Sequence, residues 1–310
     1  MVQTDERPPM EEAVVPRIAP GLDAFSAKDW FLLVAIALTW GSSFVWIEIG
    51  LENLAPTFIT LLRIVFGAGT LVFVKRARAP IAPEDWPQLA VLGLVWMAAP
   101  LLLFPIAQQW IASSLAGMIN GSMPIFAGVI AALLMRRWPP VKTMLGIALG
   151  FAGVVAVSWP AVQGSRATAL GAGLVLAATI CYGIAANLAI PLQQKYGTLP
   201  VILRALLVAL AITLVPGIIG ATQSSWDLAS VAAIVPLGVF GTGLAFVWMG
   251  TLLGRVGAAR GSVTIYFVPV VAILMGAIFE NESIALISLV GTALVLAGAF
   301  LTSRIQVKRT

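Results

Sequence analysis

The sequence predicts an all-α membrane protein of ten transmembrane helices, arranged as a 5+5 inverted-topology repeat. Three observations support this fold class. Hydrophobic residues make up 60% of the 310 residues and charged residues only 10%, whereas soluble domains carry about 25% charged residues. One apolar segment recurs later in the chain, and the basic residues gather in alternate loops.

Long apolar stretches define the helices. A helix needs about 20 mostly apolar residues to span a bilayer. The uncharged run 86–135 is long enough for two such helices, and residues 53–74 form a span that only Arg63 interrupts. The ten helices are expected at residues 30–48, 56–74, 86–108, 112–135, 143–159, 169–192, 198–220, 230–253, 258–279 and 283–303.

The segment 112–158 recurs 145 residues later, at 257–303, without a gap. Nine residues are identical between the two copies. They include a proline inside a helix, Pro124 and Pro269, and two glycines at fixed spacing. At the same offset, Leu92-Gly93 corresponds to Leu237-Gly238. Membrane transporters are commonly built from such internal repeats.

The repeat predicts the domain organisation. A first five-helix repeat is expected at 30–160 and a second at 161–303. A cytoplasmic N-terminal tail, 1–29, and a C-terminal tail, 304–310, flank them. The first tail has no hydrophobic core, so we expect no cleavable signal peptide.

The basic residues indicate how the helices are oriented. With the N-terminus inside, fifteen of the 18 Lys and Arg residues fall in cytoplasmic segments, one (Arg166) falls outside, and Arg63 and Arg204 lie within helices. This is a strong positive-inside signal. Because each repeat has five helices, the second copy enters the membrane upside down. We expect a multi-pass protein of the cell's inner (plasma) membrane with both termini in the cytoplasm.

The composition also limits the partners. There is no histidine and a single cysteine, Cys181, so neither a metal, a cofactor nor an internal disulfide is expected. The pI is about 9.8, but the basic residues lie in short loops between spans, so no nucleic-acid partner is expected. The predicted partners are a small-molecule substrate and the lipid bilayer. Gly146 and Gly150 let helices approach closely, either inside the protein or in a homodimer.

Several local motifs lie within these helices. They are Thr39-Trp40-Gly41-Ser42-Ser43-Phe44 in the first helix, Pro56 followed by Arg63 in the second, Pro124 in the fourth, and the glycine-rich helices 143–159 and 283–303. Together with the repeat, they resemble the drug/metabolite transporter superfamily, in particular its EamA-type bacterial amino-acid and metabolite exporters. The resemblance covers residues 30–303. It implies alternating access around a central cavity lined by the first, third, fourth, sixth, eighth and ninth helices.

Charged residues inside helices are candidate functional residues, because a charge is costly in the membrane. Arg63 lies about 10 Å along its helix from Pro56. Glu48 lies near the same outer end of the bundle. Our main hypothesis is a structural ion pair between Arg63 and Glu48. The alternative is that Arg63 faces the cavity and holds a substrate carboxylate. Arg204, near a helix end, is expected to snorkel to the interface.

The middle of the bundle has no Asp, Glu, Lys or His. Proton-coupled carriers usually relay protons through such residues. The sequence therefore favours an uncharged cavity, a neutral or zwitterionic substrate, and facilitated export rather than proton antiport.

Polar and aromatic residues of the predicted cavity helices are the candidate substrate-binding residues. Buried Trp and Tyr need a partner for their N–H or O–H, although some pack between helices instead. The candidates are Trp40, Ser43, Trp96, Asn120, Tyr182, Asn187, Trp248 and Tyr266. Pro124 and Pro269 each remove a helix hydrogen bond, and are candidate gating hinges.

Other classes of protein fit the sequence less well. An intramembrane enzyme needs histidine ligands, paired mid-membrane acids or a mid-membrane lysine, and the sequence has none of these. A sensor or scaffold would need a soluble domain, and a channel usually has a charged filter. The sequence favours an exporter of amino acids, including aromatic ones. A multidrug, amphiphile or sugar permease remains the alternative.

Overall fold

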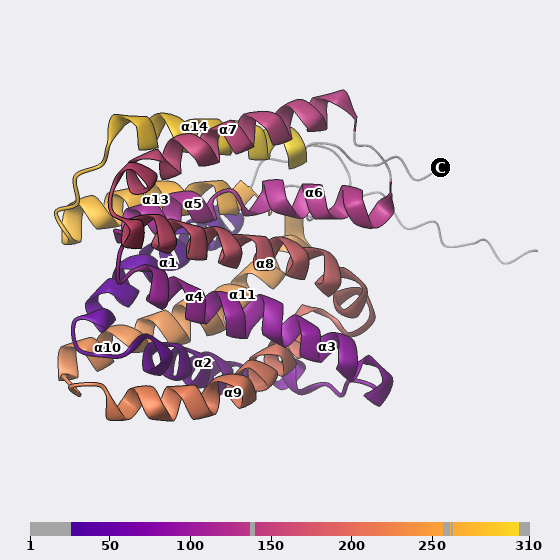
Figure 1. Cartoon of the computed structure of the whole chain (residues 1–310). Coiled ribbons are helices and arrows are strands. Elements are labelled where there is room, and N and C mark those ends of the chain that lie inside the picture. The colour runs from indigo at the N-terminus through magenta and orange to yellow at the C-terminus, as the bar shows by residue number, and fades with distance from the viewer. Residues whose placement is uncertain (1–25, 137–139, 257–260, 262, 304–310) are drawn as a thin grey trace, which may run out of the picture.

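The computed structural model describes residues 26–136, 140–256, 261 and 263–303, and its regular elements there are all helical (Figure 1). The first half contains α1 (Ala27–Leu51), α2 (Pro56–Val72), η1 (Lys75–Arg78), η2 (Pro83–Asp85), α3 (Trp86–Leu92), η3 (Gly93–Ala98), α4 (Ala99–Ala107), α5 (Ser113–Asn120), α6 (Met123–Met135) and α7 (Val141–Gln163). The second half contains α8 (Arg166–Tyr196), α9 (Thr198–Thr222), α10 (Leu228–Pro236), η4 (Leu237–Leu244), α11 (Ala245–Val256), α13 (Val263–Phe279) and α14 (Leu286–Ser303).

These helices are long and apolar enough to lie in a membrane. Seven helical stretches meet the length and hydropathy needed for a span, and three further apolar stretches are shorter, at residues 56–72, 263–279 and 286–301. Large apolar side chains such as Phe73, Leu133 and Val215 are exposed on the outside of the bundle. The all-helical membrane fold is therefore confirmed.

Corresponding helices of the two halves pack antiparallel. A Cβ on Gly217 of α9 would lie 2.5 Å from the Leu61 Cβ of α2, whereas one on Gly220, further along α9, would meet Thr57, earlier in α2. The pair α5 and α13 shows the same reversal, since Gly117 faces Ala272 and Gly121 faces Pro269. Such reversal is what an inverted repeat produces.

The pair α7 and α14 lies at one edge of the bundle (Figure 1) and is joined through glycines. A Cβ on Gly298 would lie 2.5 Å from both the Gly146 carbonyl oxygen and the Gly150 backbone nitrogen. A Cβ on Gly153 would lie 2.6 Å from the Val295 nitrogen. The backbones can approach this closely only without side chains. The glycine pair of α7 thus serves packing within the chain.

Two π-helical segments occupy corresponding places in the halves. They are η3 and η4, and they begin at Gly93 and Leu237, 144 residues apart. A π-helix widens a helical turn and is frequent at functional sites. The sequence repeat Leu92-Gly93 and Leu237-Gly238 marks both segments.

The fourth expected helix is divided. Residues 112–135 were expected as one helix with a kink at Pro124, but α5 ends at Asn120 and α6 begins at Met123. Pro124 lies in the first turn of α6, where its missing N–H costs nothing. Pro269 lies inside α13, as expected. The two prolines are therefore in different local structures.

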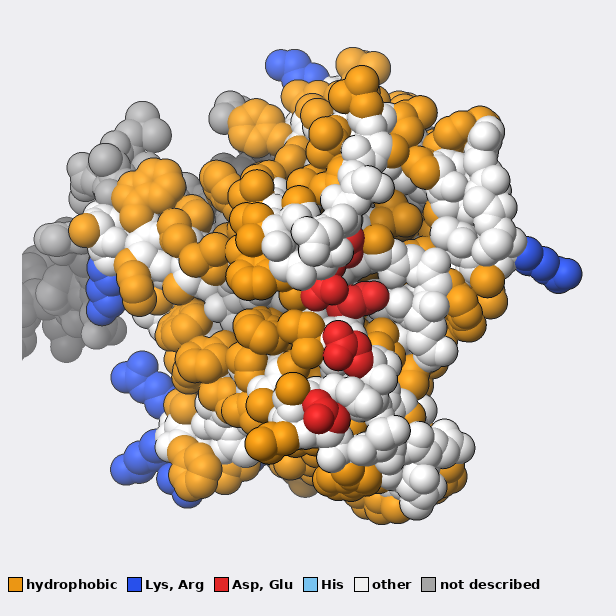
Figure 2. Space-filling view, turned by 90° about the vertical axis from the view of Figure 1, so that its left-hand side faces the viewer, with side chains coloured by type: hydrophobic (Ala, Val, Ile, Leu, Met, Phe, Trp, Pro, Cys, Tyr) orange, Lys and Arg blue, Asp and Glu red, His pale blue; other side chains and the backbone are white. Residues whose placement is uncertain are grey.

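The two ends of the bundle differ in charge. One end, here called the acidic end, contains Glu48, Glu52, Glu280 and Glu282, and carboxylates gather on that face in Figure 2. The opposite end, here called the basic end, contains Lys75, Arg78, Lys195 and Arg255. Burial and the neighbouring carboxylates of Glu282 and Glu52 raise the pKa of Glu280, which lies beyond the end of α13.

Candidate functional site

A cavity of about 380 Å³ lies at the centre of the bundle. All six helices that the family resemblance implied contribute residues to the lining. In addition, α2 contributes Arg63, and α9 contributes Thr198 and Ile202. The lining continues to Gln193 and Leu253, near the basic end. A volume of this size suits a small metabolite.

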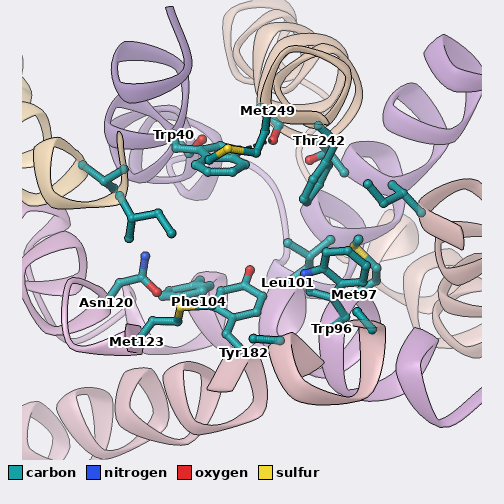
Figure 3. Close-up of a pocket in the computed structure, with 18 of the residues that line it drawn as sticks. Trp40, Trp96, Met97, Leu101, Phe104, Asn120, Met123, Tyr182, Thr242 and Met249 are labelled. Carbon is teal, nitrogen blue, oxygen red and sulfur yellow. Dashed lines mark hydrogen bonds between the residues drawn. The ribbon is translucent and has the colours of Figure 1, made fainter. Parts of the chain in front are cut away.

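Aromatic rings form two groups around the cavity (Figure 3). Phe246 lies between Trp40 and Trp96, with ring centroids 5.7 and 5.6 Å away in edge-to-face geometry. Phe104 lies between Phe44 and Tyr182, at 5.5 and 6.0 Å. The first group combines α1, η3 and α11, so it holds the two halves of the chain together.

Trp40 also connects α1 to the π-helical segment of the second half. Its indole N–H donates to the Gly241 carbonyl oxygen at 3.0 Å. A Cβ on Gly241 would lie 3.0 Å from the Ser43 hydroxyl oxygen, so α1 and η4 are close here. The polar edge of Trp40 is therefore used for helix packing, and its ring remains part of the cavity wall.

Five of the eight candidate substrate-binding residues line this cavity. They are Trp40, Ser43, Trp96, Asn120 and Tyr182. The Asn120 Oδ1 atom is buried without a hydrogen-bond partner among the described residues, and Figure 3 shows Asn120 across the cavity from Thr242. The Tyr182 hydroxyl points into the cavity and has no hydrogen bond within the described part of the chain. That these residues bind substrate stays a prediction.

The other three candidates lie outside the lining of this cavity, and a role for them in substrate binding stays a prediction. The Asn187 amide donates to the carbonyl oxygens of Ala127 and Gly183, both at 3.0 Å. The Tyr266 hydroxyl donates to Ala299 at 3.0 Å, and the Trp248 ring packs near Phe240. The polar groups of Asn187 and Tyr266 therefore bond backbone carbonyls, and the Trp248 ring packs against another aromatic ring. A residue's helix was predictable from sequence, but its direction around the helix was not.

The ion pair expected between Arg63 and Glu48 is absent from the described residues. Arg63 Nε donates to the Thr242 hydroxyl at 2.8 Å, while Glu48 accepts from the Gln108 amide at 3.1 Å. Arg63 belongs to the cavity lining and Glu48 does not. The expectation of an uncharged cavity is therefore wrong. The two residues face different neighbours because α2 packs against η4 here.

The lining also includes residues that the sequence reasoning did not single out. They include Met97, Met123 and Met249, together with Phe104, Thr242 and Phe246. Methionine adapts its shape to varied apolar ligands. The sequence signal for Thr242 and Phe246 was their position shortly after Gly238, which corresponds to Gly93 in the repeat.

Hydrogen bonds connect helices at the acidic end of the bundle. The Gln108 amide donates to the Phe44 carbonyl at 2.8 Å and to Glu48. The Glu282 carboxylate accepts from the backbone N–H and hydroxyl of Ser113 at 2.8 and 2.7 Å, and from the Ser114 N–H at 3.1 Å. Glu282 thereby caps the first turn of α5, where a negative charge is favoured.

The basic end has its own contacts between helices. Arg255 of α11 pairs with Asp29 of α1, and Lys195 of α8 pairs with Asp85 at 2.7 Å. Arg204 donates to the carbonyl oxygens of Ala77, Arg78 and Ala79, so its guanidinium has partners outside the cavity. These pairs are partly exposed, and such pairs contribute little each.

An apolar helical bundle with an internal repeat around a substrate-sized cavity defines a membrane transporter. The chain belongs to the EamA-like transporter family, whose sequence pattern matches residues 29–159 and again residues 169–304. This places it in the drug/metabolite transporter superfamily.

Similar proteins include transporters from bacteria and archaea. The chain is 26% identical over 287 residues to a probable terminal-alkyne amino-acid exporter of Streptantibioticus cattleyicolor, covering 90% of this chain and 94% of that protein. It is 24% identical to a probable amino-acid metabolite efflux pump of Escherichia coli (strain K12), covering 89% and 95%. An uncharacterized transporter of Archaeoglobus fulgidus is 27% identical, with 89% and 99% covered.

A solved crystal structure shows the same fold. It matches with a TM-score of 0.64 and 18% sequence identity, over 91% of this chain and 99% of the other. At this identity the match supports the architecture alone.

Proposed function

We propose that the protein exports amino acids, including aromatic ones, across the inner membrane by alternating access. The observation that carries this proposal is the cavity itself. Its walls are aromatic and methionine-rich, and they come from both halves of the chain. Relatives named as an amino-acid exporter and an amino-acid metabolite efflux pump support the substrate class.

Ten membrane spans in a 5+5 inverted repeat are part of this proposal. The divided helices α3–η3–α4, α5–α6 and α10–η4–α11 each act as one span. With the basic end in the cytoplasm, as the positive-inside rule requires, both termini are cytoplasmic. The cavity then faces the cytoplasm, and the bonds of Gln108 and Glu282 close the outer mouth.

With the cavity facing the cytoplasm, export begins when a substrate enters it from that side. The substrate packs against the rings of Trp40, Trp96 and Phe246, and the outer contacts at Gln108 and Glu282 then break while the inner end closes. The break between α5 and α6 and the proline inside α13 lie beside each other at Gly121 and Pro269, and they supply the bending.

A multidrug or amphiphile exporter is the second candidate. Three methionines in the lining favour it, because such walls accept ligands of varied shape. The two candidates differ in whether the substrate needs the polar groups of an amino acid.

A transport assay tests the proposal. The purified protein is reconstituted into proteoliposomes, and uptake of labelled amino acids and of labelled cationic drugs is measured with and without an imposed pH gradient. We expect uptake of apolar and aromatic amino acids that is insensitive to the gradient. Uptake of drugs alone would overturn the substrate class, and strong dependence on the gradient would overturn the facilitative mechanism.

A further inference from the structure

Arg63 presents a buried cation to the cavity without a carboxylate partner. Its side chain is only 7% exposed. The salt bridges of the described residues join other side chains. A guanidinium has five N–H donors, and the single hydrogen bond that the Arg63 side chain makes in the described part of the chain uses Nε. The four donors on its terminal nitrogens are left for a ligand.

Thr242 fixes the orientation of this guanidinium. The Thr242 hydroxyl donates to the Leu237 carbonyl oxygen, five residues earlier in the π-helical segment, at 3.2 Å. Its lone pair therefore faces Arg63 Nε. Close packing of α2 on η4 supports this geometry, because a Cβ on Gly67 would lie 2.7 Å from the Thr242 Cγ2 atom.

A second glycine keeps the backbone of Arg63 against the same segment. A Cβ on Gly238 would lie 2.9 Å from the Arg63 carbonyl oxygen and 2.5 Å from the Phe66 Cβ. Both distances are too short for a side chain at position 238, so this close packing requires glycine. The position of Arg63 is thus set by both its backbone and its Nε atom, and its terminal nitrogens remain available.

An unpaired charge in an apolar interior is costly. Among the described residues that line the cavity there is no Asp or Glu that could neutralise Arg63. The planar guanidinium matches the two oxygens of a carboxylate in a bidentate pair. A ligand that brings a carboxylate into the cavity supplies the missing partner.

We propose that Arg63 is the carboxylate subsite of the cavity, and that the transported compounds are monocarboxylates with an apolar body. The inference rests on the proposed export function and narrows its substrate class. The apolar body contacts Trp96, Phe246 and Met249, which line the same cavity. The positive charge of Arg63 disfavours cationic amphiphiles, and neutral sugars leave it unpaired.

A series of matched ligands tests the subsite without any substitution. Binding to the purified full-length protein is measured at constant salt and pH 7 for L-phenylalanine, 3-phenylpropionate, L-phenylalaninamide and phenethylamine. The first two carry a carboxylate and the last two do not. We expect the carboxylates to bind about 10- to 100-fold more tightly, the usual range for a charged hydrogen-bonded pair. Equal affinity for acid and amide would overturn the proposal.

Substitutions locate the effect at Arg63. Arg63→Gln removes the charge and is expected to abolish the preference for carboxylates, whereas Arg63→Lys retains part of it. Arg204→Gln removes a guanidinium that bonds backbone carbonyls outside the cavity, so the preference should persist there. Retention of the full preference in a folded Arg63→Gln protein would contradict the assignment.

Failure of this inference differs from failure of the proposed function. If carboxylates bind through Arg63 but labelled amino acids are not transported, the subsite stands and the exporter proposal falls. If amino acids are transported and their amides are transported equally well, the exporter stands and the subsite falls.

Discussion

Two partly buried tyrosines show how similar residues differ in their contacts. The Tyr182 hydroxyl lines the cavity and has no hydrogen bond in the described part of the chain, whereas the Tyr266 hydroxyl donates to Ala299 of α14. Both were candidate binding residues, because both lie in helices that the family resemblance places around the cavity. The structure separates them by what each hydroxyl contacts.

Removing each hydroxyl should therefore have opposite consequences. Tyr266→Phe loses an intramolecular hydrogen bond, and we expect it to lower the free energy of unfolding by about 0.5–1.5 kcal/mol with KM for substrate unchanged. Tyr182→Phe should leave thermal stability unchanged and raise KM. Thermal unfolding in detergent and transport kinetics measure the two effects. The reverse pattern would place the binding site on α13 and α14 instead.

Which candidates line the cavity was predictable where one turn of helix joins two of them, and not where the direction of the side chain around the helix decides. Trp40 and Ser43 are one turn apart and both line the cavity. Asn187 is five residues from Tyr182, about 140° around the helix, and it bonds α6 instead. Arg63 was placed in the correct helix, but which of two faces it used depended on tertiary packing.

At the scale of helices, glycines decide how closely the two halves pack. Gly298 faces the α7 backbone, whereas a Cβ on Gly173 would meet no atom within 4 Å. Both glycines lie inside helices, so alanine gains about 1 kcal/mol of intrinsic helix propensity at either site. Only Gly298 carries an opposing packing cost.

This pair gives a direct stability prediction. Gly298→Ala should lower the melting temperature, because overpacking of a tight contact costs about 1–3 kcal/mol. Gly173→Ala should leave the melting temperature unchanged or raise it. Both proteins are compared by thermal unfolding in the same detergent. Equal melting temperatures would show that α7 and α14 are not packed as described.

The cap on α5 gives a prediction about the outer gate. Glu282→Ala removes the carboxylate that holds the Ser113 and Ser114 N–H groups, and losing a helix cap costs about 0.5–2 kcal/mol. This contact joins the α13–α14 connection to α5 at the proposed outer gate. We therefore expect its loss to increase the fraction of protein molecules in the outward-open state.

Cysteine accessibility measures this shift. In a background with Cys181→Ala, a cysteine at Phe104 should react faster with an impermeant maleimide from the acidic side once Glu282 is replaced. The matched control is Glu84→Ala, which removes an exposed carboxylate at the opposite end. An unchanged labelling rate in the Glu282 variant would show that this cap does not hold the gate closed.

The sequence predicted the helices well because their apolar runs are long, but local backbone irregularities escaped it. The break at 121–122 lies where Gly121 packs closely against Pro269 of the other half, and the π-helical segments η3 and η4 were likewise not expected. The repeated Leu-Gly pair carried the only sequence signal for η3 and η4.

For the whole molecule, the internal repeat and the charge distribution were the most informative features. They predicted an inverted repeat, and three pairs of corresponding helices, α2 with α9, α5 with α13 and α7 with α14, pack antiparallel. The repeat alone could not decide between the two placements that the sequence left open for Arg63, in an ion pair with Glu48 or facing the cavity, and the structure has Arg63 in the lining.

The central claim is that the two halves expose one cavity alternately to the two sides of the membrane. Counterflow in proteoliposomes tests it most directly. With unlabelled L-phenylalanine inside, labelled L-phenylalanine added outside should enter faster than into empty vesicles and transiently exceed its outside concentration. Uptake that is unaffected by preloading would contradict alternating access and indicate a channel-like path.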